Sequence, residues 1–184
     1  METKLIRSLA AIAAACAVLL PAGAQGLRPS GYFAQGGIAE GRAWNASVGI
    51  TWPWSWRSAL LGTEVGGLTE AYIAHWDGRS PTGRRGFTQV GVIPVFRFRF
   101  DQGRSPWFAE AGVGISAMDQ HFVAPTKQFT TSFNFVDVAG VGRSFGAARE
   151  QEVSLRLQHV SNAGIKEPNL GLTYFGATLG IPFD

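Results

Sequence analysis

Apolar residues recur at every second position through most of this chain, and this alternation constrains its fold more than any other feature. In residues 109–117, Ala109, Val113 and Ile115 share one parity with other apolar residues, while the intervening positions hold Glu110, two glycines and a serine. A repeat of two is that of a β-strand with two different faces, whereas the helical repeat of about 3.6 is hard to find. The chain is therefore expected to be all-β.

Eight alternating stretches can be counted, separated by clusters of turn-forming residues. An even number of antiparallel strands, joined in sequence, is typical of a closed up-and-down barrel. The stretches span approximately residues 30–40, 43–53, 58–74, 87–100, 105–118, 131–145, 150–161 and 171–183.

The connections between these stretches differ in length. Residues 101–104 and 146–149 are expected to form short turns, whereas residues 75–86, 118–130 and 162–170 are expected to form long loops. Bacterial outer-membrane barrels have short turns on the periplasmic side and longer loops outside the cell. The pattern therefore predicts a barrel whose second, third and fourth outer connections are long.

Alternation by itself does not separate a soluble barrel from a membrane barrel, because the apolar face points inward in the first and toward lipid in the second. Most stretches have ten or more residues, enough for a tilted strand to cross the apolar layer. Aromatic residues also gather near strand ends, as in an interfacial girdle. We therefore expect an eight-stranded antiparallel transmembrane β-barrel in the outer membrane, rather than a soluble barrel that binds a small apolar ligand. The girdle residues would be Trp52, Trp54, Trp56, Trp76, Phe100 and Trp107.

Residues 1–24 are expected to be a secretory signal peptide, which leaves residues 25–184 as a single barrel domain. Lys4 and Arg7 precede an apolar run over residues 9–20, and the segment ends on small residues. That run is shorter than the ~20 residues that a membrane-spanning helix needs. The only cysteine lies inside this segment, and a formal net charge of +3 gives no support to a nucleic-acid partner.

The densest group of chemically active residues is "LQHVSNAGIKEPN", residues 157–169. His159 and Ser161 continue the parity of the apolar residues before them, so both are expected to point out of the barrel toward lipid, at the outer end of the seventh strand. Such a placement suits hydrogen bonding to lipid headgroups. It also suits acyl transfer, because residues i and i+2 share a strand face about 6.5 to 7 Å apart, and a histidine can act as base to a serine hydroxyl at that spacing.

The loop after this pair carries further donors. Asn162, Gly164 and Asn169 offer backbone or side-chain N–H groups that could hold a developing oxyanion. No group of histidine, cysteine and acidic residues has the spacing of a metal site.

Residues 159–169, "HVSNAGIKEPN", resemble the signature H-x-S-N-A-G-[IL]-K-x-P-N of the lipid A 3-O-deacylase (PagL) family of outer-membrane enzymes. Residues 107–114 and 133–142 are similar to the fifth and sixth strands of that family. The resemblance implies hydrolysis of the ester at position 3 of lipid A, the membrane anchor of lipopolysaccharide, without a metal or organic cofactor. It implies that Ser161 is the nucleophile and His159 its base. By the same resemblance, Asn162, Gly164 and Asn169 belong to the loop that shapes the oxyanion site.

The family also has a glutamate fourteen residues after the histidine, where this chain has Thr173. A threonine hydroxyl can fix the imidazole tautomer but carries no charge. Asp137 has outward parity and would lie opposite His159, either as a substitute acid or in a structural role, and Glu167 could reach the site from the loop. If no acid is supplied, the alternative is a non-catalytic outer-membrane barrel that binds lipid or is structural.

The remaining polar residues of the predicted outer loops are less specific. Two histidines, His75 and His121, are most simply exposed loop residues. Homodimer formation stays open. Five cations could pair with lipopolysaccharide phosphates or could simply be solvated: Arg79, Arg84, Arg85, Lys127 and Lys166.

Overall fold

The computed structural model describes residues 28–80, 83–124 and 127–183. The predicted signal peptide, residues 1–24, and the cysteine within it lie outside the described residues. Within the described residues, no helix is long and apolar enough to cross a membrane.

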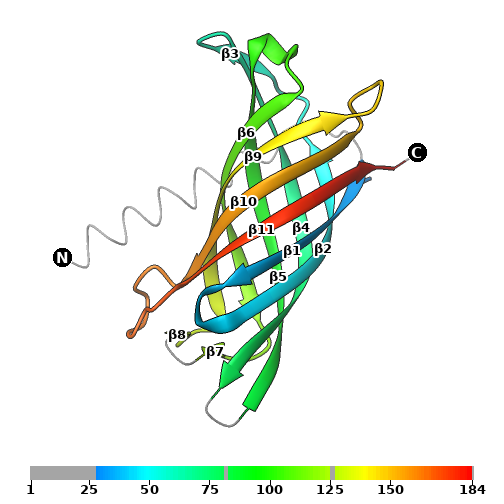
Figure 1. Cartoon of the computed structure of the whole chain (residues 1–184). Helices are drawn as coiled ribbons and strands as arrows, with labels where there is room; N and C mark the ends of the chain where they lie inside the picture. Colours follow the sequence, from blue (N-terminus) through cyan, green and yellow to red (C-terminus); the bar gives the residue numbers. More distant parts are fainter. Residues whose placement is uncertain (1–27, 81–82, 125–126, 184) are drawn as a thin grey trace, which may run out of the picture.

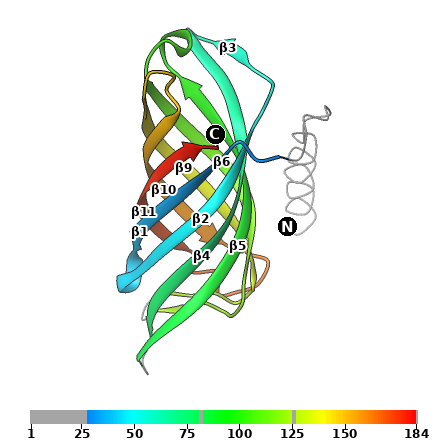
Figure 2. The ribbon, with the colours of Figure 1, turned by 90° about the vertical axis from the view of Figure 1, so that its right-hand side faces the viewer.

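Eight long antiparallel strands form the barrel, as predicted (Figures 1 and 2). The sheet closes into a barrel because the first strand, β1, pairs with the last, β11, while β2 pairs with the next barrel strand, β4. The barrel strands are β1 (Gly31–Ala39), β2 (Ala43–Pro53), β4 (Thr63–Ser80), β5 (Gly83–Arg99), β6 (Trp107–Met118), β9 (Phe133–Phe145), β10 (Gln151–Ser161) and β11 (Leu172–Pro182). The smaller elements are β3 (Ser58–Leu60), β7 (Val123–Ala124) and β8 (Lys127–Gln128), with short 3-10 turns η1 (Glu40–Arg42) and η2 (Asp101–Gly103).

The predicted long loop over residues 75–86 is wrong, because β4 extends to Ser80 and β5 begins at Gly83. They are 18 and 17 residues long and stay paired up to Ser80 and Gly83. The glycines of this segment read as turn residues, yet here they lie in a regular antiparallel ladder. Figure 1 shows the resulting hairpin extending beyond the other strands at the end of the barrel that carries the long connections.

The third predicted stretch, residues 58–74, is also not one strand. It contains β3, a tight turn and the start of β4, with β3 paired to β4 as a small hairpin. Leu61 and Gly62 have φ of 48° and 75°, which makes the turn. A leucine rarely adopts this left-handed conformation, so of the two turn residues only Gly62 indicates a turn in the sequence.

The inside of the barrel is polar and its outside is apolar. Arg156 is 1% exposed in the lumen and binds two buried carboxylates, with Nε 2.6 Å from Glu110 Oε1 and Nη2 2.7 Å from Glu70 Oε1. Large apolar side chains such as Ile115 and Leu157 lie exposed on the outer wall. This arrangement is that of a membrane barrel with lipid around it, and it rules out the soluble alternative.

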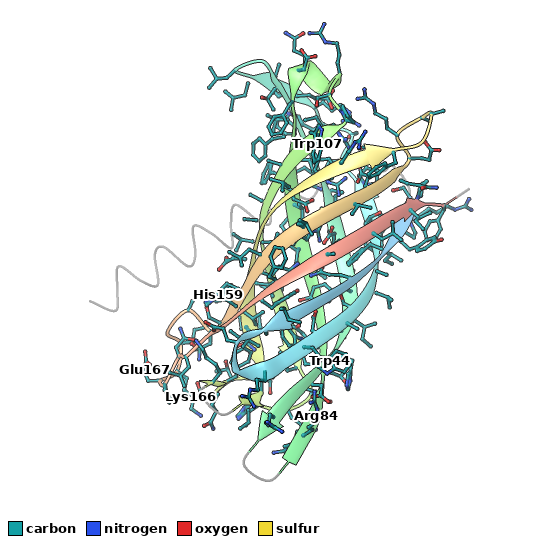
Figure 3. All side chains as sticks on the ribbon, in the orientation of Figure 1. Trp44, Arg84, Trp107, His159, Lys166 and Glu167 are labelled. Carbon is teal, nitrogen blue, oxygen red and sulfur yellow. The ribbon has the colours of Figure 1, made fainter. Side chains whose placement is uncertain are left out.

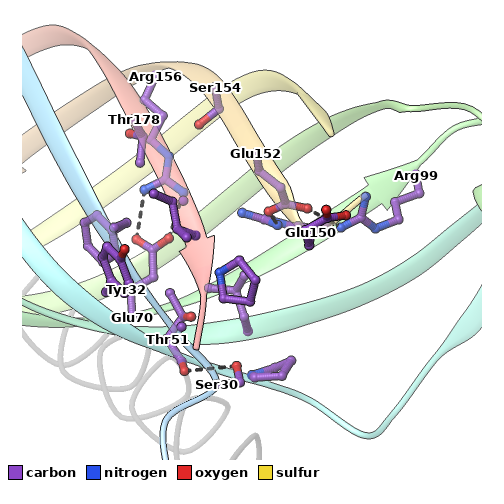
Figure 4. Close-up of a pocket in the computed structure, with 18 residues that line it drawn as sticks. Ser30, Tyr32, Thr51, Glu70, Arg99, Glu150, Glu152, Ser154, Arg156 and Thr178 are labelled. Carbon is purple, nitrogen blue, oxygen red and sulfur yellow. Dashed lines mark hydrogen bonds and ion pairs between the residues drawn. The ribbon is translucent and has the colours of Figure 1, made fainter. Parts of the chain in front are cut away.

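A cavity of about 200 Å³ lies in the lumen, toward the end that holds both described chain ends. Figure 4 shows Arg99, Glu152 and Arg156 among its lining residues, and the ion pair between Arg156 and Glu70. Arg99 Nη2 lies 2.6 Å from Glu152 Oε1. The cavity is therefore part of an ion-paired interior rather than an apolar ligand pocket.

Aromatic side chains fill the opposite, outer end of the lumen. Trp76 is fully buried, packs edge-on against Tyr174 with ring centroids 4.9 Å apart, and donates from Nε1 to Gln89 Oε1 at 2.8 Å. Phe122 and Phe129, which flank β7 and β8, are buried in the same cluster. The loop between β6 and β9 therefore covers the outer mouth of the barrel.

The predicted aromatic girdle is correct only in part. Trp56, Phe100 and Trp107 are exposed, as an interfacial position requires. Trp54 and Trp76 instead turn inward and are buried, because each indole N–H finds a hydrogen-bond acceptor inside; for Trp54 it is Thr69 Oγ1 at 3.1 Å.

Candidate active site

Three neighbouring strands bring the predicted site residues into one row on the outer wall. His159 on β10 pairs directly with Asp137 on β9 and with Thr173 on β11. This register is the predicted one. All three residues have the parity of the exposed apolar residues of their strands, such as Leu157 and Phe175, so the row faces lipid. Figure 3 shows His159 at the end of β10, next to the loop that holds Lys166 and Glu167.

The imidazole of His159 is held from one side. Its Nδ1 lies 2.9 Å from Thr173 Oγ1. When Nδ1 carries the proton and donates a hydrogen bond to the hydroxyl, Nε2 is the free basic nitrogen of the ring. Asp137 lies on the other side but makes no hydrogen bond to the ring within the described part of the chain. The structure therefore assigns the contact with Nδ1 to Thr173, not to the aspartate.

Gly171 lies beside both the imidazole of His159 and Ser161. A Cβ atom at this glycine would lie 2.8 Å from His159 Nε2 and 3.5 Å from Ser161 Cβ. Nε2 thus points to the side of the strand pair where Ser161 lies. The hydroxyl makes no hydrogen bond among the described residues, so it is free to rotate toward Nε2 when substrate is present. Sequence reasoning did not identify Gly171, although the register that pairs His159 with Thr173 also places residue 171 beside Ser161.

We expect Gly171→Ala to lower turnover on the order of 10- to 100-fold, because the new methyl group would displace the imidazole and φ of 50° strains any L-residue. The rate of ester hydrolysis by the purified barrel measures this. Gly62→Ala is the matched control, since Gly62 also has a positive φ of 75° but no atom lies within 4 Å of the added Cβ. Equal rates for Gly171→Ala and the wild-type protein would show that the ring is not held at this point.

Asn162 organises the loop that follows the strand. It is 2% exposed, and its Nδ2 donates to Thr130 Oγ1 at 3.1 Å and to Lys166 O at 2.8 Å. Its Oδ1 accepts the N–H of Gly164 at 2.9 Å, and its own N–H donates to Asn169 Oδ1 at 3.2 Å. Asn162 and Gly164 were expected to donate to an oxyanion. The side-chain amide and backbone N–H of Asn162 and the backbone N–H of Gly164 instead donate within this part of the protein.

Asn169 is the expected oxyanion residue whose side-chain amide is left available. Its Nδ2 has no hydrogen-bond partner among the described residues. Its backbone N–H donates to Glu167 Oε2 at 2.9 Å. Glu167 is thus engaged within the loop and has no hydrogen bond to His159 among the described residues, so its reach to the imidazole stays a prediction.

A second loop holds the first in place. Thr130 Oγ1 lies 3.0 Å from Lys166 O and 3.3 Å from Pro168 O, besides accepting from Asn162. Lys127 Nζ donates to Leu170 O at 3.1 Å. Neither residue was identified as part of the site from the sequence, because the loops are more than thirty residues apart and no strand register connects them.

We expect Thr130→Val, which keeps the shape but removes the hydroxyl, to lower turnover on the order of tenfold. Loss of these bonds loosens a loop whose Asn169 must be placed to within ~0.5 Å. The rate of ester hydrolysis and the proteolytic sensitivity of the loop should change together. Thr131→Val is the matched control, because among the described residues its hydroxyl bonds only to Asn134; equal effects of the two variants would contradict the role of Thr130.

The cations expected to meet phosphates are partly engaged with the protein itself. Arg84 pairs with Asp77, and Arg85 Nη2 donates to Gln120 Oε1 at 3.0 Å. His75, expected in a loop, lies in β4 beside Trp44 with ring centroids 5.6 Å apart. No group of three or more histidine, cysteine or acidic residues that could hold a metal ion occurs in residues 28–183 as far as they are described.

The fold and the site together define an integral outer-membrane β-barrel with a histidine and a serine on its lipid-facing wall. The model of the lipid A 3-O-deacylase (PagL) family matches residues 42–182, which is most of the chain. The chain therefore belongs to this family, and the resemblance found in its sequence is confirmed.

Relatives of known identity agree with this assignment. The chain is 32% identical over 137 residues to lipid A deacylase PagL of Pseudomonas aeruginosa, covering 73% of this chain and 76% of the relative. It is 37% identical over 84 residues to lipid A deacylase PagL of Bordetella bronchiseptica, covering 46% of this chain and 44% of the relative. The crystal structure of the outer membrane enzyme PagL superposes with a TM-score of 0.73 at 29% identity, over 84% of this chain and 100% of that one. The barrel and its outer-membrane location are thereby confirmed.

Proposed function

We propose that this protein is an esterase that hydrolyses the 3-O-linked 3-hydroxyacyl chain of lipid A in the outer leaflet, with Ser161 as nucleophile and His159 as its base. The observation that carries the proposal is the position of both residues on the lipid-facing wall at the outer end of β10, with Nδ1 of His159 held by Thr173. A lipid in the outer leaflet reaches this position with its ester groups without leaving the membrane.

The reaction then follows acyl transfer to a serine. Nε2 of His159 takes the proton of Ser161 as Oγ attacks the ester carbonyl carbon. The carbonyl oxygen becomes negative next to the free amide of Asn169, which donates to it. Collapse of the tetrahedral intermediate breaks the bond to the sugar oxygen, which leaves with the proton from the imidazolium.

Water completes the cycle. His159 removes a proton from a water molecule, which attacks the acyl-serine carbonyl, and Ser161 regains its proton as a 3-hydroxy fatty acid is released. The chemistry asks for a base, a nucleophile and one oxyanion donor. Thr173 serves to hold the imidazole in the tautomer with a free Nε2.

A non-catalytic barrel that binds lipid is the second candidate, and the neutral Thr173 at the family's acid position is the observation that favours it. Incubation of the purified barrel with lipid A in detergent separates the two. Release of free 3-hydroxy fatty acid, detected by mass spectrometry, supports the esterase. Retention of intact lipid A on the barrel, with no release, supports the binding protein. The homodimer stays a prediction, which the mass of the detergent-solubilised particle checks.

A further inference from the structure

The row of site residues extends by one more member, Glu40, from a different part of the chain. The last pair of the β1–β11 ladder is Ala39 with Tyr174, and Glu40 follows directly, with its carboxylate hydrogen-bonded to the backbone N–H of Thr173. His159 occupies the opposite side of Thr173. Glu40 begins η1, which contacts β11, and it is exposed with the outward parity of Ile38. Figure 1 shows the turn between β1 and β2 at the same end of the barrel as the loop between β10 and β11.

The carboxylate of Glu40 is fixed by the loop that supports the site. Its Oε2 lies 2.9 Å from Lys127 Nζ, and the same ammonium donates to Leu170 O, one residue before Gly171. Glu40 is thus tied to the outer end of β11 rather than free in solvent.

The charge state of Glu40 follows from these contacts. The hydrogen bond from Lys127 holds the pKa of Glu40 below its ordinary value, burial opposes this, and the charge of Lys127, the backbone N–H of Thr173 and the charge of His159 add to it. Glu40 is therefore ionised at neutral pH. A carboxylate and a protonated imidazole that flank the same residue attract each other.

We propose that Glu40 takes over the part of the missing acid, as a positioning residue that acts on His159 through Thr173. This inference rests on the proposed hydrolase function. Thr173 Oγ1 accepts a hydrogen bond from Nδ1–H and fixes the tautomer, while the carboxylate beyond it stabilises the charge that His159 gains as it takes the serine proton. Glu40 itself gains no proton and no covalent bond changes on it. The family match begins at residue 42, so it does not include this glutamate.

The other two carboxylates near the site are less suited to this part. Asp137 pairs with His159 from β9, on the side opposite to Thr173, and its side chain has no hydrogen bond within the described residues. Glu167 accepts from the backbone of Asn169 inside the loop. Glu40 is the carboxylate that lies next to the residue holding Nδ1.

The test must separate a charge effect from a structural one, because Glu40 also anchors Lys127. Glu40→Gln keeps hydrogen-bonding capacity toward Lys127 and removes the charge. We expect it to lower kcat on the order of tenfold with KM unchanged. In the Thr173→Glu background, where a carboxylate contacts the imidazole directly, Glu40→Gln should change kcat less than about twofold. Asp77→Asn, which neutralises another ion-paired acid of the outer surface, is the matched control and should leave kcat unchanged.

Two readouts keep this inference separable from the proposed function. Hydrolysis of lipid A reports on the function, and the rate at which a fluorophosphonate labels Ser161 reports on activation of the nucleophile alone. Slower labelling in Glu40→Gln, with the same heat-modifiable gel mobility as wild type, supports the role of Glu40. An equal loss in both backgrounds, or no loss in either, overturns it and leaves the hydrolase standing. If the wild-type barrel is inert while Thr173→Glu is active, the role of Glu40 is overturned. If both proteins are inert, the proposed hydrolase function is overturned as well.

Discussion

Replacement of Ser161 by alanine is expected to lower the deacylation of lipid A on the order of 10³-fold or more. The hydroxyl is the proposed nucleophile, and His159 by itself would leave water as a poorly positioned substitute. Ser161 is half-buried on the outer wall and its hydroxyl makes no contact within the described residues that a methyl group would break. The barrel should therefore keep its fold. The initial rate of 3-hydroxy fatty acid release from lipid A micelles measures the effect.

Ser132→Ala is the matched control for this substitution, because Ser132 is an exposed serine just before β9 and its hydroxyl has no partner among the described residues. It should react at the wild-type rate. Residual activity of Ser161→Ala within tenfold of wild type would mean that another group forms the acyl intermediate, or that none forms.

Replacement of Thr173 by glutamate is expected to raise turnover on the order of 100-fold. In serine hydrolases, loss of the acid beside the histidine costs about 10⁴-fold, and Glu40 offsets only part of that. The hydrogen bond of 2.9 Å between Nδ1 and Oγ1 marks the direction in which a carboxylate would meet the ring. Thr173 is only half-buried, so a longer side chain has room.

Thr173→Gln separates charge from shape, since glutamine has the size of glutamate but no charge. It should give no gain over wild type. Equal rates for the glutamate and glutamine variants would show that a carboxylate at this position does not act on His159.

Much of the fold could be predicted because strand alternation is a local signal. The parity of Leu155 and Leu157 was enough to place His159 on the outer wall, and its place at the end of the seventh strand put it at the outer surface. What could not be predicted depends on non-local pairing. Gly78 and Gly86 indicate a loop when read locally, yet their backbone groups pair in the long β4–β5 hairpin.

The candidate site was predictable to the same extent. Strand register, obtained from the centres of two hairpins, correctly placed Asp137 and Thr173 on either side of His159. Thr130, Lys127 and Glu40 come from two other outer connections, and their positions follow from loop packing that no periodicity encodes. The inward Trp54 and Trp76 were missed for a related reason, because an indole N–H acceptor inside the barrel outweighs a place in the membrane interface.

Mass spectrometry of lipid A from a Gram-negative host tests the central claim most directly. The host should lack a deacylase of its own and should express either the wild-type chain or Ser161→Ala. Both proteins should reach the outer membrane in equal amounts and show the heat-modifiable gel mobility of a folded barrel. The account predicts a lipid A species lacking the 3-hydroxyacyl chain at position 3 with the wild-type chain, and none with Ser161→Ala. Unchanged lipid A in the presence of the folded wild-type barrel would contradict it.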